Sequence, residues 1–331
     1  PQTFSQGSIR WIVMSTSKNI IAFNSVASAP ANDTHAEPLL AVHEPPALHI
    51  KSASTGNEYF IGDYVGEGAF GVVYACSDIW ENNLVIKFLK EVEGLRVNCH
   101  DAALKETESL MVARHQFIVP VHDAFEIDGQ YAIVSERCSQ TLSDFTCTPY
   151  FNPNPWVRAL ARCVLQAVNF THLQGMAHCD IHEGNVFAHF IPDEIMPEQY
   201  SAFVFKLGDF GLARPISSVT CETTFLKNIR PPEIIDTRTY GPIDHRVDLY
   251  QVGLLLLRFL LPSCPPFSQE DILSGRPQDL ALEQNEPLFD AIAQMLRRHV
   301  IHRTPNAITA WHNIQIALIE TSEPSQPPLT Q

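Results

Sequence analysis

Five short apolar runs, each bounded by turn residues, make up the first part of the hydrophobic pattern. They are Phe60–Val65, Val72–Tyr74, Leu84–Leu89, Ile118–Phe125 and Tyr131–Ser135. Runs rich in β-branched and aromatic residues between turn residues predict successive antiparallel strands. The segment Asp101–His115, between the third run and the fourth, has the composition of a helix.

The second part of the pattern has helical spacing. Trp156–Leu173 carries apolar residues three and four positions apart, which form one stripe along a helix. Further helices are predicted from near Asp248 through the apolar run Val252–Leu261, over Asp290–Val300 and over Ala307–Leu318. The sequence contains no internal repeat. The pattern therefore predicts a β-rich small lobe followed by a helical large lobe.

The ends of the chain differ from this pattern. Residues 1–57 are rich in serine and proline and poor in acids at the start, which predicts an N-terminal extension that is partly flexible. Its apolar runs Trp11–Met14 and Ile20–Phe23 are the alternative, a segment that docks on the main domain. We expect the domain to span 58–320 and the polar residues 321–331 to form a flexible tail.

Composition and charge exclude several classes of protein. The 331 residues are 45% hydrophobic, with 22 Lys and Arg against 37 Asp and Glu, a net charge of −15. This balance argues against nucleic acid or an anionic membrane as the main partner, and no apolar run reaches the length of a membrane span. The eight cysteines form no CxxC pair, which favours reduced thiols and a cytoplasmic location over a zinc site. Targeting stays unassigned, because the sequence begins at Pro1 and not at Met.

A glycine-rich motif and a lysine point to phosphate chemistry. The stretch Val65–Val73 has the pattern GxGxxGxV between two predicted strands, where glycines let backbone N–H groups approach phosphates. A strand follows the third glycine, whereas a dinucleotide-binding fold would have a helix there. Lys87 ends the next apolar strand and would reach phosphates below this loop. Its acidic partner on the following helix would be Glu106 or Glu108.

Two further motifs supply a base and metal ligands. His178–Asn185 has the pattern HxDxxxxN, in which Asp180 can take the proton of an attacking hydroxyl and Asn185 can bind Mg²⁺. Lys206–Gly211 contains the tripeptide DFG, whose Asp209 is a second Mg²⁺ ligand. The order and spacing of all these motifs make a chance match improbable.

With these motifs, the segment from Phe60 to Leu318 resembles the eukaryotic-type (Hanks-type) protein kinase superfamily. The resemblance implies a bilobal α+β fold with a five-stranded sheet and one helix in residues 58–138, a helical lobe in 139–320, and ATP with Mg²⁺ between them. Arg230-Pro-Pro-Glu233 stands at the family's APE motif, Asp248–Gly253 at its DxWxxG, and Arg303 at the arginine that pairs with the APE glutamate.

The same resemblance implies the site residues. It selects Glu106 over Glu108 as the partner of Lys87, makes Ser135 the residue that gates the adenine pocket, and makes Glu136–Cys138 the hinge. The catalytic residues it implies are Asp180, Lys87, Glu106, Asn185 and His182, and the metal ligands are Asn185 and Asp209. The ATP-binding residues it implies are Val65, Gly66, Glu67, Gly68, Ala69, Phe70, Gly71, Val73, Val85, Lys87, Ser135, Glu136 and Cys138.

Several positions depart from the family pattern. Cys179 replaces the arginine that holds a phosphorylated activation segment, so we expect activity that does not depend on that contact. His182 replaces a lysine and is only partly charged at neutral pH, which predicts weaker stabilisation of phosphate. Leu226 occupies the place of a threonine typical of Ser/Thr kinases, but tyrosine-kinase loop motifs are absent too, and we favour Ser/Thr specificity. The insert Ile191–Ser201 is expected to be an acidic surface loop or a docking loop for a basic partner.

Two other functions stay open at this point. The loop HxDIHxGN also resembles that of small-molecule kinases of the aminoglycoside and choline type. A pseudokinase, which keeps the fold as a binding module, is the non-enzymatic alternative. Three cysteines would lie near the nucleotide and the activation segment: Cys138, Cys179 and Cys221. We favour inert thiols over redox switches for them. The favoured partners are ATP and a protein substrate, basic in view of the acidic chain.

Overall fold

The structure is a computed structural model, and all the elements described lie within the compact unit His43–Gln331. The described residues are 45, 47–68, 71–90, 114–148, 150–193, 195–196, 200–223 and 229–320. Several predictions fall outside them: most of the helix Asp101–His115 with Glu106 and Glu108, the loop residues Ala69 and Phe70, Leu226, the greater part of 1–57, and the tail 321–331.

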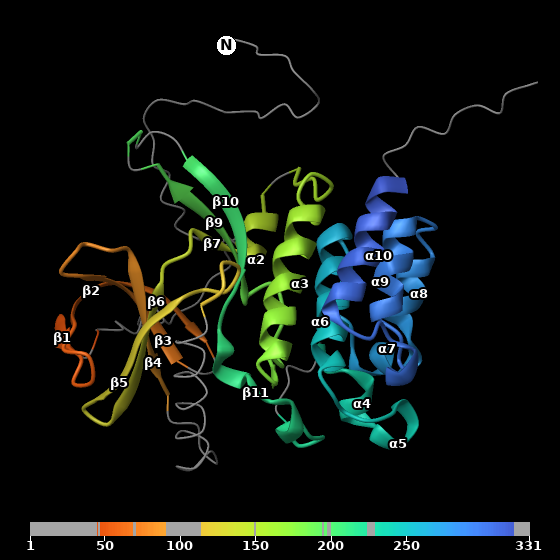
Figure 1. The fold of residues 1–331 in the computed structure, drawn as a ribbon, viewed down its shortest axis with the longest axis horizontal. Helices are drawn as coiled ribbons and strands as arrows, with labels where there is room; N and C mark the ends of the chain where they lie inside the picture. Colours follow the sequence, from red (N-terminus) through yellow and green to blue (C-terminus); the bar gives the residue numbers. More distant parts are fainter. Residues whose placement is uncertain are drawn as a thin grey trace, which may run out of the picture. The chain divides into compact units, whose positions relative to one another are not determined.

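A six-stranded antiparallel sheet forms the small lobe, in the order β1-β2-β3-β4-β6-β5 (Figure 1). Its strands are β1 (His49–Lys51), β2 (Glu58–Gly68), β3 (Gly71–Asp78), β4 (Leu84–Leu89), β5 (Val121–Ile127) and β6 (Gln130–Glu136). The prediction of five strands was wrong by one. The additional strand is β1, which pairs with β2 and buries Ile50 in the core of the sheet. The sheet therefore starts within the range 1–57 that the sequence analysis set apart from the domain.

The large lobe is mainly helical, as predicted. Its helices are α2 (Leu142–Thr146), α3 (Val157–Leu173), α4 (Pro232–Ile235), α5 (Thr237–Tyr240), α6 (Arg246–Leu260), α7 (Gln269–Ser274), α8 (Arg276–Leu282), α9 (Pro287–Met295) and α10 (Ala307–Glu320). Its short strands are β7 (Gln140–Thr141), β8 (Met176–Ala177), β9 (Val186–Pro192), β10 (Tyr200–Leu207) and β11 (Arg214–Pro215). The helix predicted over Asp290–Val300 begins and ends earlier, since Pro287 opens it and Val300 lies in a separate 3-10 turn.

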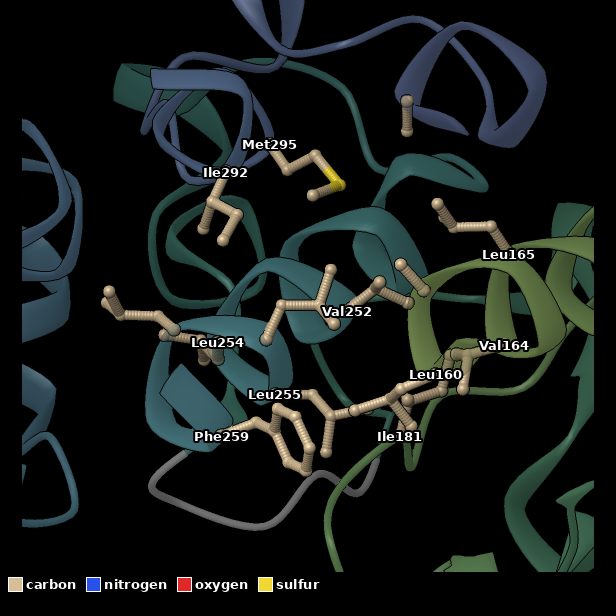
Figure 2. Close-up of a cluster of buried hydrophobic side chains, with 14 of the residues drawn as sticks. Leu160, Val164, Leu165, Ile181, Val252, Leu254, Leu255, Phe259, Ile292 and Met295 are labelled. Carbon is tan, nitrogen blue, oxygen red and sulfur yellow. The ribbon is translucent and has the colours of Figure 1, made fainter. Parts of the chain in front are cut away.

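Helix α6 lies at the centre of the large lobe. Every residue of it except Arg246 and Arg258 is buried. Figure 2 shows Val252 and Leu255 of this helix between Leu160 of α3 and Met295 of α9. Each such side chain contributes about 1.5–3 kcal/mol when it leaves water. This core fixes α6 as the platform for the loops that surround the site.

The insert Ile191–Ser201, which was expected to be a surface loop, is partly strand in the hairpin of β9 and β10. Residues Ile191 and Pro192 extend β9, and Tyr200 opens β10, so part of the range Ile191–Ser201 is strand. Phe203 of β10 packs its ring 5.0 Å from that of Trp156 and 5.9 Å from that of Phe145, measured between ring centroids. These aromatic contacts fasten the hairpin to the large lobe. Among the described residues, no helix combines the length and the apolar character that crossing a membrane requires.

Candidate active site

Two polar side chains of α6 hold the loop that carries the HxDxxxxN motif. Asp248 accepts hydrogen bonds from the backbone N–H groups of His178 and Cys179, each at 2.8 Å. Gln251 accepts from the N–H of Ile181 at 3.0 Å and donates to the carbonyl oxygen of Cys179 at 3.0 Å. Because Asp248 and Gln251 are themselves 0% exposed, the loop is attached to the buried core of the lobe.

The carboxylate of Asp248 is stabilised in its charged form. Burial raises its pKa, but the hydrogen bond and charge of His172, the charge of His178 and the N–H of Cys179 outweigh burial. The pKa of Asp248 therefore lies below its ordinary value. Burial also lowers the pKa of His178, whose ring lies 4.5 Å from that of Phe210 between centroids.

Asp180 is held by Asn185 and keeps one oxygen without a partner. The Asn185 amide nitrogen donates to Oδ2 and to the carbonyl oxygen of Asp180, both at 2.9 Å. Oδ1 of Asp180 is buried and accepts no hydrogen bond from the described residues. His182 Nε2 lies 3.7 Å from Oδ2. A buried acceptor is costly to leave unpaired, so a donor that reached Oδ1 would be bound favourably.

Lys87 and Asp209 join the two lobes. Lys87 Nζ donates to Oδ1 and Oδ2 of Asp209 at 2.8 and 2.7 Å. Asp209 has a left-handed backbone with φ of 55°, and the N–H of Gly211 donates to its side chain. Burial raises the pKa of Asp209, but the charge and hydrogen bonds of Lys87 outweigh burial, so the pKa lies below its ordinary value. Glu106, the predicted partner of Lys87, lies outside the described residues.

The glycines of the GxGxxGxV motif are needed for two different reasons. A Cβ on Gly71 would collide with the carbonyl oxygen of Phe88, so packing against β4 requires this glycine. A Cβ on Gly66 or Gly68 would meet nothing within 4 Å. The chain itself does not require these two glycines, which leaves the close approach of a ligand as a reason for them.

The predicted hinge carries a half-buried ion pair that the sequence analysis did not predict. Glu136 at the end of β6 pairs with Lys206 of β10, and His189 Nε2 lies 3.7 Å from its other oxygen. Ser135 pairs in register with Val85 of β4. Burial, with the charge of Glu136 added, raises the pKa of the Cys138 thiol to about 12, so little reactive thiolate forms.

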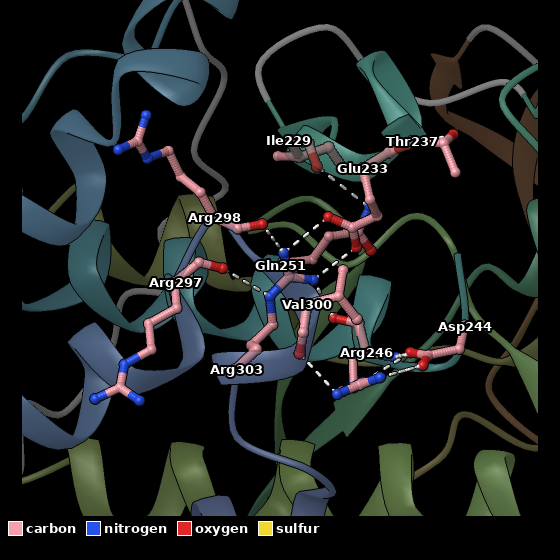
Figure 3. Close-up of polar contacts among 10 residues, drawn as sticks. All are labelled: Ile229, Glu233, Thr237, Asp244, Arg246, Gln251, Arg297, Arg298, Val300 and Arg303. Carbon is pink, nitrogen blue, oxygen red and sulfur yellow. Dashed lines mark hydrogen bonds and ion pairs between the residues drawn. The ribbon is translucent and has the colours of Figure 1, made fainter. Parts of the chain in front are cut away.

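A third carboxylate–cation pair lies deep in the large lobe, as the sequence analysis expected. Arg303 donates from its two terminal nitrogens to the two oxygens of Glu233 at 2.6 and 2.8 Å, and both side chains are 0% exposed. Figure 3 shows the same guanidinium reaching the carbonyl oxygens of Arg246, Arg297 and Arg298. The pair connects α4 to the segment before α10.

A family model described as protein kinase domain matches residues 59–307, well over half of the chain. The chain belongs to the protein kinase family. This confirms the family that the motifs indicated, and the bilobal α+β fold is confirmed as well.

Known proteins similar to this kinase are about a quarter identical to it over the aligned residues. It is 27% identical over 214 residues to serine/threonine-protein kinase 36 of Pongo abelii, covering 63% of this chain and 15% of that protein. It is 26% identical over 247 residues to cyclin-dependent kinase-like 1 of Caenorhabditis elegans, covering 72% of this chain and 63% of that protein. The kinase chain thus spans less than two thirds of each of these relatives. The crystal structure of the PknI kinase domain of Mycobacterium tuberculosis has the same fold, with a TM-score of 0.62, 19% identity, and coverage of 83% of this chain and 99% of that one.

Sequence reasoning missed three polar residues that support the site of this kinase. Gln251 holds the loop His178–Asn185, Lys206 pairs with Glu136 of the predicted hinge, and Arg258 Nη1 lies 2.6 Å from Oε1 of Glu183 in that loop. Each of them interrupts an otherwise apolar stretch of strand or helix. A polar side chain in such a stretch needs a polar partner, and this was the signal that could have identified them.

Proposed function

We propose that this kinase transfers the γ-phosphoryl group of ATP to a serine or threonine hydroxyl of a protein substrate. The observation that carries the proposal is the arrangement around Asp180. Its buried Oδ1 accepts no hydrogen bond from the described residues, and its Oδ2 accepts one from Asn185. The N–H of Gly208, next to Asp209, donates to the carbonyl oxygen of Asn185 at 2.9 Å. A base and two oxygen ligands are thereby held together by direct hydrogen bonds.

In this proposal Asp180 orients the hydroxyl of the substrate and accepts its proton through Oδ1. The carboxylate cannot turn away, because Asn185 holds both its Oδ2 and its backbone carbonyl oxygen. Most of the rate enhancement would come from positioning and from electrostatic stabilisation of the transferring group.

Asn185 and Asp209 are the residues that would hold Mg²⁺. Their side chains offer amide and carboxylate oxygens, which are the donors that this ion prefers. When bound, Mg²⁺ would neutralise charge on the phosphates of ATP. Lys87 would exchange Asp209 for the α- and β-phosphates, because its ammonium already lies between the glycine-rich strands and the DFG segment.

The hinge segment would bind the adenine through its backbone. The N–H groups of Glu136 and Arg137 donate to the carbonyl oxygens of Pro120 and Asn83, at 3.0 and 3.2 Å. We therefore assign the adenine contacts to the backbone of Cys138 and to the carbonyl oxygen of Glu136. Ser135 would line the back of this pocket, with Val73 and Val85 beside it.

The test is transfer of label from radiolabelled ATP with Mg²⁺, offered separately to a mixed protein pool and to a pool of amino sugars and amino alcohols. Label on serine and threonine of proteins, lost in Asp180→Ala, supports the proposal. Label on small molecules alone would make the chain a small-molecule kinase. Thermal stabilisation by ATP without any transfer would make it a pseudokinase. Basic and acidic peptide pools offered in parallel test the predicted basic substrate.

A further inference from the structure

The turn that follows Asp180 holds the ring of His182 in one tautomer. The backbone N–H of Gly184 donates to Nδ1 of His182 at 3.0 Å, and the N–H of Asn185 donates to the carbonyl oxygen of His182 at 3.0 Å. A ring nitrogen that accepts an N–H carries no proton of its own. The neutral ring therefore bears its proton on Nε2.

The absence of a side chain on Gly184 also leaves room for the ring of His182. A Cβ on Gly184 would lie 2.8 Å from Cε1 and 3.1 Å from Nδ1 of His182, closer than side chains pack. The φ of Gly184 lies outside the left-handed region, so backbone conformation is not the reason for a glycine here. The atoms that a Cβ would meet belong to the end of a side chain that can rotate. An alanine would therefore displace the ring and leave the loop folded.

The Nε2–H group points to the edge of the catalytic carboxylate. Nε2 lies 3.7 Å from Oδ2 of Asp180, beyond hydrogen-bond distance, and Oδ2 already accepts from Asn185. The neighbouring carboxylate of Glu183 is drawn to Arg258 at 2.6 Å, so it does not compete for the ring. The side chain of His182 is 21% exposed, which leaves this donor open to a ligand at the site.

We propose that Gly184 is a positioning residue for phosphoryl transfer, acting through His182. Its N–H fixes the proton of the imidazole on Nε2, and its missing Cβ lets the ring lie where this donor meets an oxygen of the transferring phosphoryl group. The inference rests on the proposed function, since it assigns a role in that reaction. It also explains why a histidine can stand where related kinases have a lysine.

Nitrogen-15 NMR of histidine side chains tests the tautomer without any reaction. The spectrum is recorded on the ligand-free chain in mildly alkaline buffer, and the His182 signals are assigned as those that His182→Ala removes. We expect Nδ1 of His182 unprotonated and Nε2 protonated in the wild-type chain, and a mixture of tautomers in Gly184→Ala. A protonated Nδ1 in the wild-type chain, or an unchanged spectrum in Gly184→Ala, would overturn the proposal.

A double-mutant cycle tests whether Gly184 acts through His182. We expect His182→Ala and Gly184→Ala each to lower kcat by about 100-fold, the lower end of the range for loss of one transition-state donor, with little change in KM for ATP. The double variant should match His182→Ala alone. Gly62→Ala, whose Cβ would meet only ordinary contacts at 3.6 Å and beyond, is the glycine control and should keep full activity. Losses that multiply in the double variant would overturn the role of Gly184.

A wild-type chain that transfers no phosphoryl group would contradict the proposed function, while the NMR spectra would still decide the tautomer.

Discussion

The kinase has carboxylate–cation pairs in two contrasting settings. Glu233 and Arg303 are fully buried, and every terminal guanidinium nitrogen finds a carboxylate or carbonyl oxygen. Lys87 and Asp209 form a pair of similar length, but their side chains are 18% and 32% exposed. The first setting is closed and holds helices together. The second keeps atoms open to a ligand, as a reaction site requires.

The largest effect separates activity from stability at the open site. We expect Asp180→Ala to lower phosphoryl transfer by about 10²- to 10⁴-fold, because the proton acceptor is lost. The melting temperature should stay the same or rise, because the variant removes a buried oxygen that has no partner. Transfer assays and calorimetry on the same sample measure both. Glu270→Ala, an exposed carboxylate on α7, is the control, and equal activity of the two variants would contradict the contrast.

The closed site should show the opposite result. Glu233→Gln leaves the buried guanidinium of Arg303 without its counter-charge, and we expect it to lower the free energy of unfolding by about 3–5 kcal/mol. Urea unfolding measures the loss. Replacing both partners, as Glu233→Leu with Arg303→Met, should cost less than Glu233→Gln, because no charge stays buried. A double variant that is less stable than the single one would show that the pair itself, and not the unpaired charge, matters.

Removing Lys87 should raise the pKa of Asp209 and leave the free energy of unfolding almost unchanged. In Lys87→Met, burial still acts on Asp209 but the opposing charge is gone, so we expect its pKa to rise above the wild-type value. Stability should change by no more than about 1 kcal/mol, since the pair is partly exposed. Carbon-13 NMR titration of the Asp209 carboxyl measures the pKa. The comparison fails if the Asp209 titration is the same in both proteins.

Acid should weaken the fold through Asp248. Its pKa is lower in the folded chain than in the unfolded chain, where an aspartate titrates near ~3.9. Its contribution is therefore complete above about pH 5 and is lost as the pH falls through the folded pKa. Free energies of unfolding measured between pH 7 and pH 3 should fall only at the acid end, and Asp248→Asn should show a shallower fall over that range. An identical acid slope in the variant would rule out this role.

Much of the fold was predictable because the pattern of the sequence is local. The strands β2 to β6 and the helices α3, α6 and α10 follow periods that each segment carries in itself. Strand β1 could not be predicted in this way, because three residues between prolines and a glycine show no period. These three residues are a strand only because they pair with β2, where Ile50 lies opposite Tyr59.

The site divides in the same way. Asp180, Asn185 and Asp209 could be proposed from the sequence because each motif brings its chemistry within a few residues, and their roles stay predictions. The contacts of Gln251 with the catalytic loop and of Lys206 with Glu136 join residues about 70 positions apart. Such contacts depend on how helices and strands pack, and no local pattern encodes them. The partner of Lys87 on the helix predicted for Asp101–His115 stays a prediction.

Cys179 places an apolar side chain where related kinases have an arginine that forms ionic contacts. Its side chain is buried with Val219, Ile234 of α4 and Val247 of α6, so these elements pack against the loop His178–Asn185. A clamp of phosphate and arginine weakens as ionic strength rises, whereas apolar contacts are hardly screened and weaken on cooling instead. The packing of Cys179 against these three side chains should therefore depend on temperature and change little with added sodium chloride.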